Sequence, residues 1–355
     1  MPKFYLLFIF LAFGLGSVQS QDARFAQFYA NPLYVNPALT GVFEGQLRFT
    51  ANYRVLYSSI LGTDAFRTVS AGLDVRRPAG KGNFVGLGAQ ILQDVAGETS
   101  FSRTQGQISA SFQKILGSSG RGRNAMSHYL VGGGSLGFGQ RGFDIEKAWF
   151  STQWFNDPVS GDSYIDRGLD GEPGFVGGNS ELYLDFSAGL LWYGVFGENR
   201  SMYAGAAIHH LNEPNISVID GGTDQLYRKI VGHIGGELPF GRTGFSILPA
   251  AQVMSQGPAF SAMGGANLRY TQREWREVAL RIGAWAHFSN RLDDTAADAV
   301  IISAVLEMES LQFGVSYDLT LNDLNISNDG RGAFELSVIY VKAANFRGRV
   351  DCPKF

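Results

Sequence analysis

The sequence has 355 residues, of which 46 are glycine, 13% are aromatic and only 17% are charged, and its formal net charge at pH 7 is −3. This charge excludes a strongly basic nucleic-acid-binding domain, so nucleic acid is not expected as a partner. The excess of glycine and aromatic residues over charged ones favours a β-structured membrane protein.

The first twenty residues resemble an export signal. Lys3 precedes an apolar run from Phe4 to Leu15, and small residues follow up to Ser20. We therefore predict a signal peptide over 1–20, since the run is shorter than the roughly 20 residues of a membrane-spanning helix. The single cysteine, Cys352, excludes an intramolecular disulfide.

An aromatic-rich segment with two Asn-Pro pairs follows the signal peptide. Asn31-Pro32 and Asn36-Pro37 cannot lie inside a strand or helix, because each proline lacks an N–H and restrains the asparagine before it to an extended conformation. We predict that residues 21–44 form an irregular periplasmic segment or a plug within the lumen of a barrel.

Apolar and polar residues then alternate with the period of a β-strand. The clearest case is 311–320, where Leu311, Phe313 and Val315 alternate with polar or small residues. Fourteen such stretches are predicted as strands: 45–56, 65–77, 82–92, 101–115, 127–141, 182–195, 201–211, 226–239, 244–255, 260–271, 275–288, 298–308, 310–319 and 332–343. Each is long enough to cross a membrane as a tilted strand. Residues 45–343 are therefore predicted to form an all-β, antiparallel, up-and-down transmembrane barrel of about 14 strands, closed by its first and last strands.

The connections alternate in length. Those after even-numbered strands are mostly short, whereas those after odd-numbered strands are mostly long, notably 142–181, 212–225, 289–297 and 320–331. We interpret the long ones as extracellular loops. The connection 256–259 departs from this alternation, which leaves its hairpin open to reassignment. Residues 344–355 are expected to form a periplasmic tail.

Two groups of residues invite a functional interpretation. The loop 142–181 carries Trp149, Trp154 and Phe155, and it could fold inward as a constriction or outward as a docking surface. Charged residues also fall on the polar faces of predicted strands, where they either form a solvated wall with ion pairs or contact a solute or polypeptide: Arg48, Arg54, Arg67, Asp74, Arg103, Arg281 and Asp318.

No catalytic, cofactor or metal site is predicted. Residues 133–137, Gly-Gly-Ser-Leu-Gly, match a hydrolase pattern, but such matches arise by chance in a glycine-rich chain and no helical pattern follows. The same glycines match the dinucleotide-binding spacing without the strand, helix and acidic residue that it needs. The five histidines do not have metal-ligand spacing.

The segment from Gln27 to Gly41, with its two Asn-Pro pairs, and the terminal Cys352-Pro353 resemble the PorP/SprF family of outer-membrane proteins. This family belongs to the type IX secretion and gliding motility systems of Bacteroidetes. The resemblance implies a noncatalytic protein of the Gram-negative outer membrane that binds, delivers or anchors secreted surface proteins.

The partners implied are adhesins with C-terminal sorting domains, the translocon, periplasmic ring components and outer-membrane lipid. The candidate partner contacts are Asn31, Pro32, Asn36, Pro37, Trp149, Trp154 and Phe155. The alternative is an outer-membrane channel or transporter for small or hydrophobic solutes, with its lumen either open or plugged.

Overall fold

The computed structural model describes residues 22–119, 126–158, 160–168, 178–197, 199–241, 243–271, 278–290, 295–322, 325–343 and 352–353. The predicted signal peptide, 1–20, lies outside these residues. So does most of the predicted tail, 344–355.

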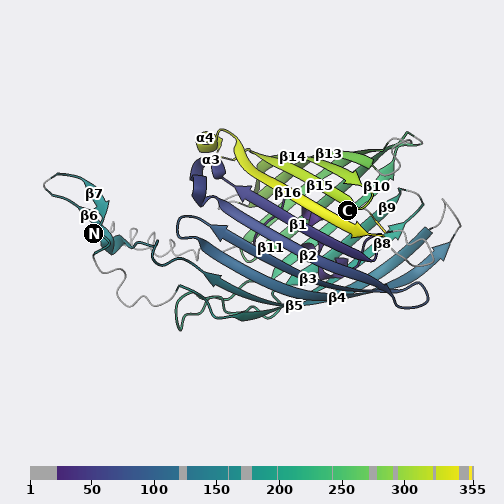
Figure 1. Ribbon diagram of the computed structural model, residues 1–355, viewed down its shortest axis with the longest axis horizontal. Helices are drawn as coiled ribbons and strands as arrows, with labels where there is room; N and C mark the ends of the chain where they lie inside the picture. The colour runs from purple at the N-terminus through teal and green to yellow at the C-terminus, as the bar shows by residue number, and fades with distance from the viewer. Residues whose placement is uncertain are drawn as a thin grey trace, which may run out of the picture.

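Fourteen strands close into one antiparallel barrel (Figure 1). They are β1 (Leu47–Leu56), β2 (Phe66–Pro78), β3 (Phe84–Ala96), β4 (Phe101–Ser119), β5 (Met126–Gly142), β8 (Tyr183–Val195), β9 (Ser201–His209), β10 (Lys229–Pro239), β11 (Phe245–Gln256), β12 (Ala259–Thr271), β13 (Val278–Asn290), β14 (Thr295–Met308), β15 (Leu311–Thr320) and β16 (Arg331–Lys342). Each strand pairs with its neighbour in sequence, and β1 pairs with β16. The predicted barrel is confirmed, with every predicted strand present.

The remaining elements are short. Strands β6 (Trp154–Asn156) and β7 (Ser163–Ile165) form a separate two-stranded sheet. The short helices are η1 (Phe28–Ala30), α2 (Pro32–Val35), η2 (Pro37–Leu39), α3 (Ser58–Leu61), η3 (Gly62–Asp64), η5 (Ser151–Gln153) and α4 (Asn325–Asn328). Within the described residues, no helix is both long and apolar enough to cross a membrane.

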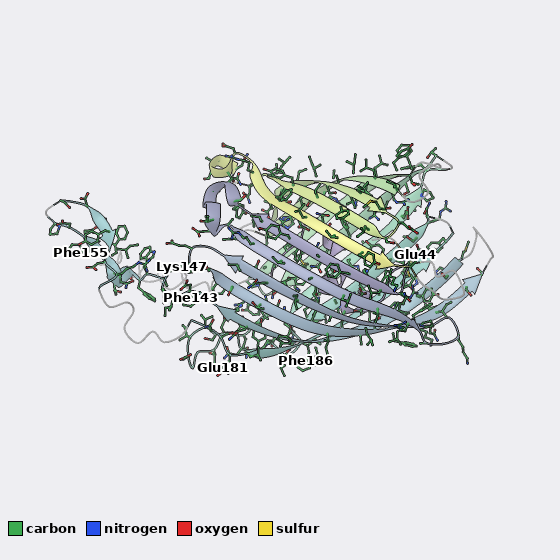
Figure 2. All side chains as sticks on the ribbon, viewed as in Figure 1. Glu44, Phe143, Lys147, Phe155, Glu181 and Phe186 are labelled. Atoms are coloured by element: carbon green, nitrogen blue, oxygen red, sulfur yellow. The ribbon has the colours of Figure 1, made fainter. Side chains whose placement is uncertain are left out.

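The two faces of the wall differ in polarity because successive strand residues point to opposite sides. In β1, Arg48, Thr50 and Arg54 are buried inside the barrel, whereas Phe49 and Tyr53 are exposed outside. Side chains such as Phe186 point outward along the length of the wall (Figure 2). The outer surface of the barrel is therefore apolar, and its inner face carries most of the polar and charged residues of the strands.

Arg67 corrects one expectation. The sequence predicts Arg67 on the polar face, but in the structure its side chain points outward and is exposed, and its neighbour Phe66 points inward. The reason is that Val69, Leu73 and Val75 define the outer face of this strand, and Arg67 shares their parity. At this rim of the barrel, the polar residue Arg67 lies on the outer face and the apolar residue Phe66 lies on the inner face.

The connections after β5, β9 and β15 confirm the predicted long loops, and they distinguish the two ends of the barrel. The connection predicted at 289–297 is shorter than expected, because β13 continues to Asn290 and β14 begins at Thr295. We call the two ends of the barrel the short-turn end, where 79–83 and 196–200 lie, and the long-loop end, where 143–182 and 210–228 lie. In Figure 2, Glu44 lies at the former and Phe143 at the latter. The hairpin of β11 and β12 is real, although its turn at the long-loop end is tight. Gly257 there has a φ of +55°, and an added Cβ would collide with the ring of Tyr227.

Candidate functional site

The lumen contains the N-terminal part of the described chain. We call residues 22–45 the lumen segment. Its residues are almost all buried, and Phe28 and Tyr29 lie 5.8 and 5.7 Å from the ring of Trp285 in β13. The main hydrophobic core of this protein therefore lies between the lumen segment and the inner face of the wall.

The two Asn-Pro pairs begin two short helices of the lumen segment. Pro32 is the first residue of α2 and Pro37 is the first residue of η2, positions at which the missing proline N–H costs no hydrogen bond. The Asn36 side chain caps η2 by accepting a hydrogen bond of 2.8 Å from the Ala38 N–H. The motif thus folds the chain into compact turns.

The two asparagine side chains bind different strands of the wall. Asn36 Nδ2 donates to the carbonyl oxygens of Leu190 and Ala206, at 3.1 and 3.2 Å. Asn31 Oδ1 accepts a hydrogen bond of 2.5 Å from Gln90 Nε2. Both asparagines are completely buried, so they hold the lumen segment to two different parts of the wall.

Glycines in the wall allow this close approach. A Cβ at Gly86, Gly189 or Gly314 would lie less than 3.0 Å from Thr40 O, Asn36 Oδ1 or Gln27 Oε1, respectively. At Gly133 it would lie 2.5 Å from Pro37 O. Part of the glycine excess of this chain therefore serves contact between the wall and the lumen segment.

Wall side chains also replace the backbone partners that the lumen segment lacks. Ser111 Oγ donates to Thr40 O at 2.6 Å, and Gln113 Nε2 donates to Gly41 O at 2.8 Å. The Gly41 N–H donates to Asp74 Oδ2 at 2.7 Å. Buried backbone groups need such partners, so the polar lumen face satisfies this segment without a strand ladder.

Two buried arginine networks connect the wall to the lumen segment. Arg48 pairs with Asp74 at 2.8 Å. Arg54 pairs with Asp318 at 2.5 Å and with Glu335 at 3.0 Å. Glu335 also accepts hydrogen bonds from two backbone N–H groups of the lumen segment, those of residues 26 and 27.

Asp22, the first described residue, forms a third network. It pairs with Arg103, with Lys229 at 2.6 Å and with His210 at 2.9 Å. Burial acts to raise the pKa of Asp22, but these three cations outweigh it and hold that pKa well below its usual range. Burial acts to lower the pKa of His210, but Asp22 and Asp185 outweigh it, so that its pKa is raised. The imidazolium form of His210 thus bridges two carboxylates.

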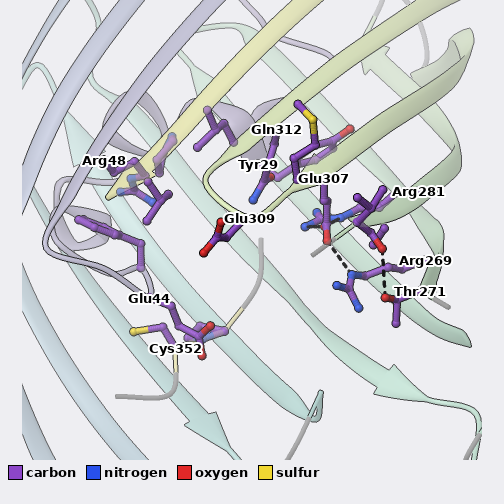
Figure 3. Close-up of a pocket in the computed structure, with 18 residues that line it drawn as sticks. Tyr29, Glu44, Arg48, Arg269, Thr271, Arg281, Glu307, Glu309, Gln312 and Cys352 are labelled. Carbon is purple, nitrogen blue, oxygen red and sulfur yellow. Dashed lines mark hydrogen bonds and ion pairs between the residues drawn. The ribbon is translucent and has the colours of Figure 1, made fainter. Parts of the chain in front are cut away.

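Cavities remain on both sides of the lumen segment. The one at the short-turn end encloses about 390 Å³, and its lining includes Glu44, Arg269, Glu307 and Cys352 (Figure 3). Cys352 Sγ there lies 2.7 Å from Arg76 Nη1, and burial raises the pKa of the thiol. The one at the long-loop end encloses about 350 Å³. The two cavities share no lining residue.

The loop that carries the three aromatic residues projects outward and does not fold into the lumen as a constriction. We call residues 143–168 the outer loop. Its sheet of β6 and β7 lies well away from the barrel (Figure 1). Trp149, Trp154 and Phe155 are 43%, 49% and 38% exposed, and the rings of Trp149 and Trp154 lie 6.1 Å apart.

The structure thus divides the predicted contact residues into two separate groups. Asn31, Pro32, Asn36 and Pro37 are buried in the lumen, whereas the three aromatic residues are exposed on the outer loop. The sequence did not single out Asp22, Arg24, Glu335 or the wall glycines, because their roles depend on what faces them across the lumen. Ser135 of the hydrolase-like pattern lies within β5, with strand on both sides. Among the described residues, no three His, Cys, Asp or Glu side chains gather as a metal site.

Comparisons with known proteins give one family. The family model for "Type IX secretion system membrane protein PorP/SprF" matches residues 17–340. A comparison with curated protein sequences finds no significant match.

Many solved structures of barrels are similar in outline. One is a deletion mutant of the TodX monoaromatic hydrocarbon channel, at 12% identity and a TM-score of 0.44, covering 88% of this chain and 94% of that one. Another is the CymD monoaromatic hydrocarbon channel, at 10% identity and a TM-score of 0.43, covering 88% and 93%. A third is the outer membrane protein Omp33 of Acinetobacter baumannii, at 7% identity and a TM-score of 0.38, covering 84% and 99%.

Proposed function

This chain belongs to the PorP/SprF family of type IX secretion system membrane proteins, and from that premise we propose that it binds, delivers or anchors secreted surface proteins that carry C-terminal sorting domains. It is an outer-membrane component of the secretion system and interacts with other components of that system. The specific partners that we propose are adhesins, the translocon and the periplasmic ring.

The outer loop carries this proposal. Short turns of outer-membrane barrels lie in the periplasm and long loops lie outside, so we assign the long-loop end to the cell surface. Trp149, Trp154 and Phe155 would then be presented to secreted proteins. Exposed aromatic side chains that rest on a rigid scaffold are typical anchors of protein interfaces. We propose these three residues as partner contacts.

The filled lumen supports binding at the surface over passage through the barrel. Residues 22–45 occupy the space that a solute would need, and buried ion pairs and hydrogen bonds hold them there. The four Asn-Pro residues would reach a partner only if the lumen segment were displaced. We therefore propose that they act by holding this segment.

Affinity purification from outer membranes in mild detergent, followed by mass spectrometry, tests the proposal. The variant Trp149→Ser, Trp154→Ser, Phe155→Ser is expected to recover at least about tenfold less sorting-domain protein than the wild type, because even one aromatic anchor contributes on the order of 2 kcal/mol. The matched control is Lys147→Ser, Asp162→Ser, which changes exposed polar residues of the same outer loop. Equal recovery from both variants would contradict the role of the aromatic residues. A wild-type barrel that purifies alone and conducts solutes in planar bilayers would favour the channel.

A further inference from the structure

The cavity at the long-loop end has a defined place in the barrel. We call it the outer vestibule. Leu56 and Phe66 line it on either side of the connection from β1 to β2, and Ala96 and Phe101 line it on either side of the connection from β3 to β4. Its volume of about 350 Å³ falls within the range of roughly 300–1,000 Å³ that is typical of small-ligand sites.

Part of the wall of the outer vestibule is apolar. The apolar residues that line it, beside polar ones, are Leu56, Phe66, Leu92, Ala96 and Phe101. In β1 the inward residues Arg48, Thr50 and Arg54 are followed by Leu56. At the same level of β2, the inward position is occupied by an apolar residue, Phe66, which is 37% exposed. A large aromatic side chain that faces an open cavity is suited to contact an apolar ligand group.

Arg24 of the lumen segment is the one arginine lining the outer vestibule whose partner is neutral. Arg54 pairs with Asp318 and Glu335, and Arg103 pairs with Asp22. Arg24 Nη1, in contrast, donates to His287 Nε2 at 2.6 Å, and an imidazole nitrogen accepts a hydrogen bond only when it is unprotonated. No carboxylate in the described part of the chain lies within ion-pair distance of Arg24. Burial, and then Arg54, lower the pKa of Arg24 to about 10, so it remains charged at neutral pH.

Polar groups of the wall complete the site. Asp94 lines it and accepts a hydrogen bond of 2.5 Å from Thr68 Oγ1, and Gln105 also lines it. A carboxylate has about four acceptor positions, so Asp94 can also accept a hydrogen bond from a peptide N–H. The outer vestibule thus combines apolar wall residues, a cation with no carboxylate of the described residues within ion-pair distance, and an acceptor.

We propose that the outer vestibule binds the C-terminal end of a polypeptide, with Arg24 pairing with the terminal carboxylate and Phe66 and Leu56 contacting an apolar last side chain. This inference rests on the proposed function, because a sorting domain at the C-terminus of the cargo brings such an end to the long-loop end of the barrel. A fatty acid shares the carboxylate on an apolar stem. Its stem carries no N–H that could donate to the remaining acceptor positions of Asp94, whereas a peptide backbone does, so the polar part of the wall favours the peptide.

Fluorescence polarisation with purified full-length protein in detergent tests this binding. The probe is a short fluorescein-labelled peptide that ends in phenylalanine, prepared with a free C-terminal carboxylate or with a C-terminal amide. The free acid is expected to bind at least about tenfold more tightly than the amide, as hydrogen bonds to charged groups predict. In Arg24→Gln this difference is expected to disappear. Arg67→Gln is the matched control, because Arg67 lies at the same rim but points outward, and it is expected to keep the full difference.

Three outcomes would overturn the inference: equal binding of acid and amide, an unchanged difference in Arg24→Gln, or displacement of the peptide by dodecanoic acid at lower concentrations than by the unlabelled free-acid peptide. The last outcome would assign the site to a fatty acid. Recovery of sorting-domain protein by the wild type separates this failure from failure of the proposed function. If the cargo still copurifies while the peptide does not discriminate, only the terminus site is wrong.

Discussion

Gly132 and Gly133 are neighbours in β5, but an added Cβ would meet very different surroundings at the two positions. At Gly133 it would lie 2.5 Å from Pro37 O and 2.6 Å from Ala38 Cα. At Gly132 its nearest neighbour would be Leu190 Cδ2, at 3.8 Å. Successive strand residues face opposite sides, so one glycine faces the lumen segment and the other faces outward. Gly133 is therefore needed for close contact with the lumen segment. At Gly132 a larger side chain would meet no such contact.

Gly133→Ala is therefore expected to lower the free energy of unfolding by about 1–3 kcal/mol, the usual cost of overpacking a tight contact. Gly132→Ala is expected to be neutral or slightly stabilising, because alanine loses less backbone entropy than glycine in a strand. Denaturant unfolding in detergent micelles measures both changes as shifts of the midpoint. Equal shifts for the two variants would show that the lumen segment does not press on β5.

Among the elements of the fold, the lumen segment fills the interior of the barrel, as a central helix or a packed core does in other barrels. Short helices at Asn31-Pro32 and Asn36-Pro37 place carbonyl oxygens against Ser111, Gln113 and other wall side chains. A segment without a strand ladder remains buried because the wall supplies its hydrogen-bond partners. A 14-stranded barrel is wide enough to hold such a segment and to leave an opening without it.

Deletion of residues 22–41 is expected to open the barrel to ions. Planar bilayer recordings should show discrete channels for the deleted protein and low conductance for the intact one. Only the fraction that migrates as a folded barrel on unheated gels is reconstituted, so that misfolded protein does not contribute. The matched control is removal of the exposed hairpin between Trp154 and Ile165, which lies on the outer loop. Low conductance of the folded deletion variant would mean that the lumen is closed by something other than the lumen segment.

At the scale of the whole molecule, the outer wall presents an apolar surface to lipid. Ile91 in the middle of β3 is 65% exposed, and Leu190 in β8 is 62% exposed. Such exposure would cause aggregation of a protein in water but suits the hydrocarbon layer of a membrane. The polar lumen face and the lumen segment together then supply the interior packing that a soluble protein obtains from its core.

Ile91→Arg is expected to destabilise the folded protein in lipid vesicles by about 2–4 kcal/mol, because a charge near the bilayer midplane loses its hydration. Ile60→Arg, in α3 at the long-loop end, should cost only about 0–1 kcal/mol, since an interface position remains hydrated. Urea unfolding from vesicles measures both values. If Ile60→Arg were as costly as Ile91→Arg, the assignment of the membrane layer to the middle of the strands would have to be abandoned.

The fold could be predicted from local patterns because alternation in a strand is a local property. Leu311, Phe313 and Val315 point to one side whatever the rest of the chain does, and the predicted strand at 310–319 differs from β15 by one residue at each end. The same rule failed at Arg67, because a residue at a rim need not share the polarity of the face to which it belongs. The tight turn at Gly257 also departs from the predicted alternation in connection length. Its fit against Tyr227 depends on tertiary contact and is not a local feature of the sequence.

The alternation in the sequence is enough to predict an all-β barrel of about fourteen strands, the apolar face of most of them, and the longest connections. Local patterns do not show that residues 22–45 fill the lumen, that Arg24 has no carboxylate within ion-pair distance among the described residues, or that the outer loop points away; these follow from the folded barrel. The physical reason is separation along the chain: Asn36 meets Leu190 and Ala206, 154 and 170 positions away. Such contacts form only after the barrel has closed, because closure and the tilt of the strands bring inward residues of distant strands close together.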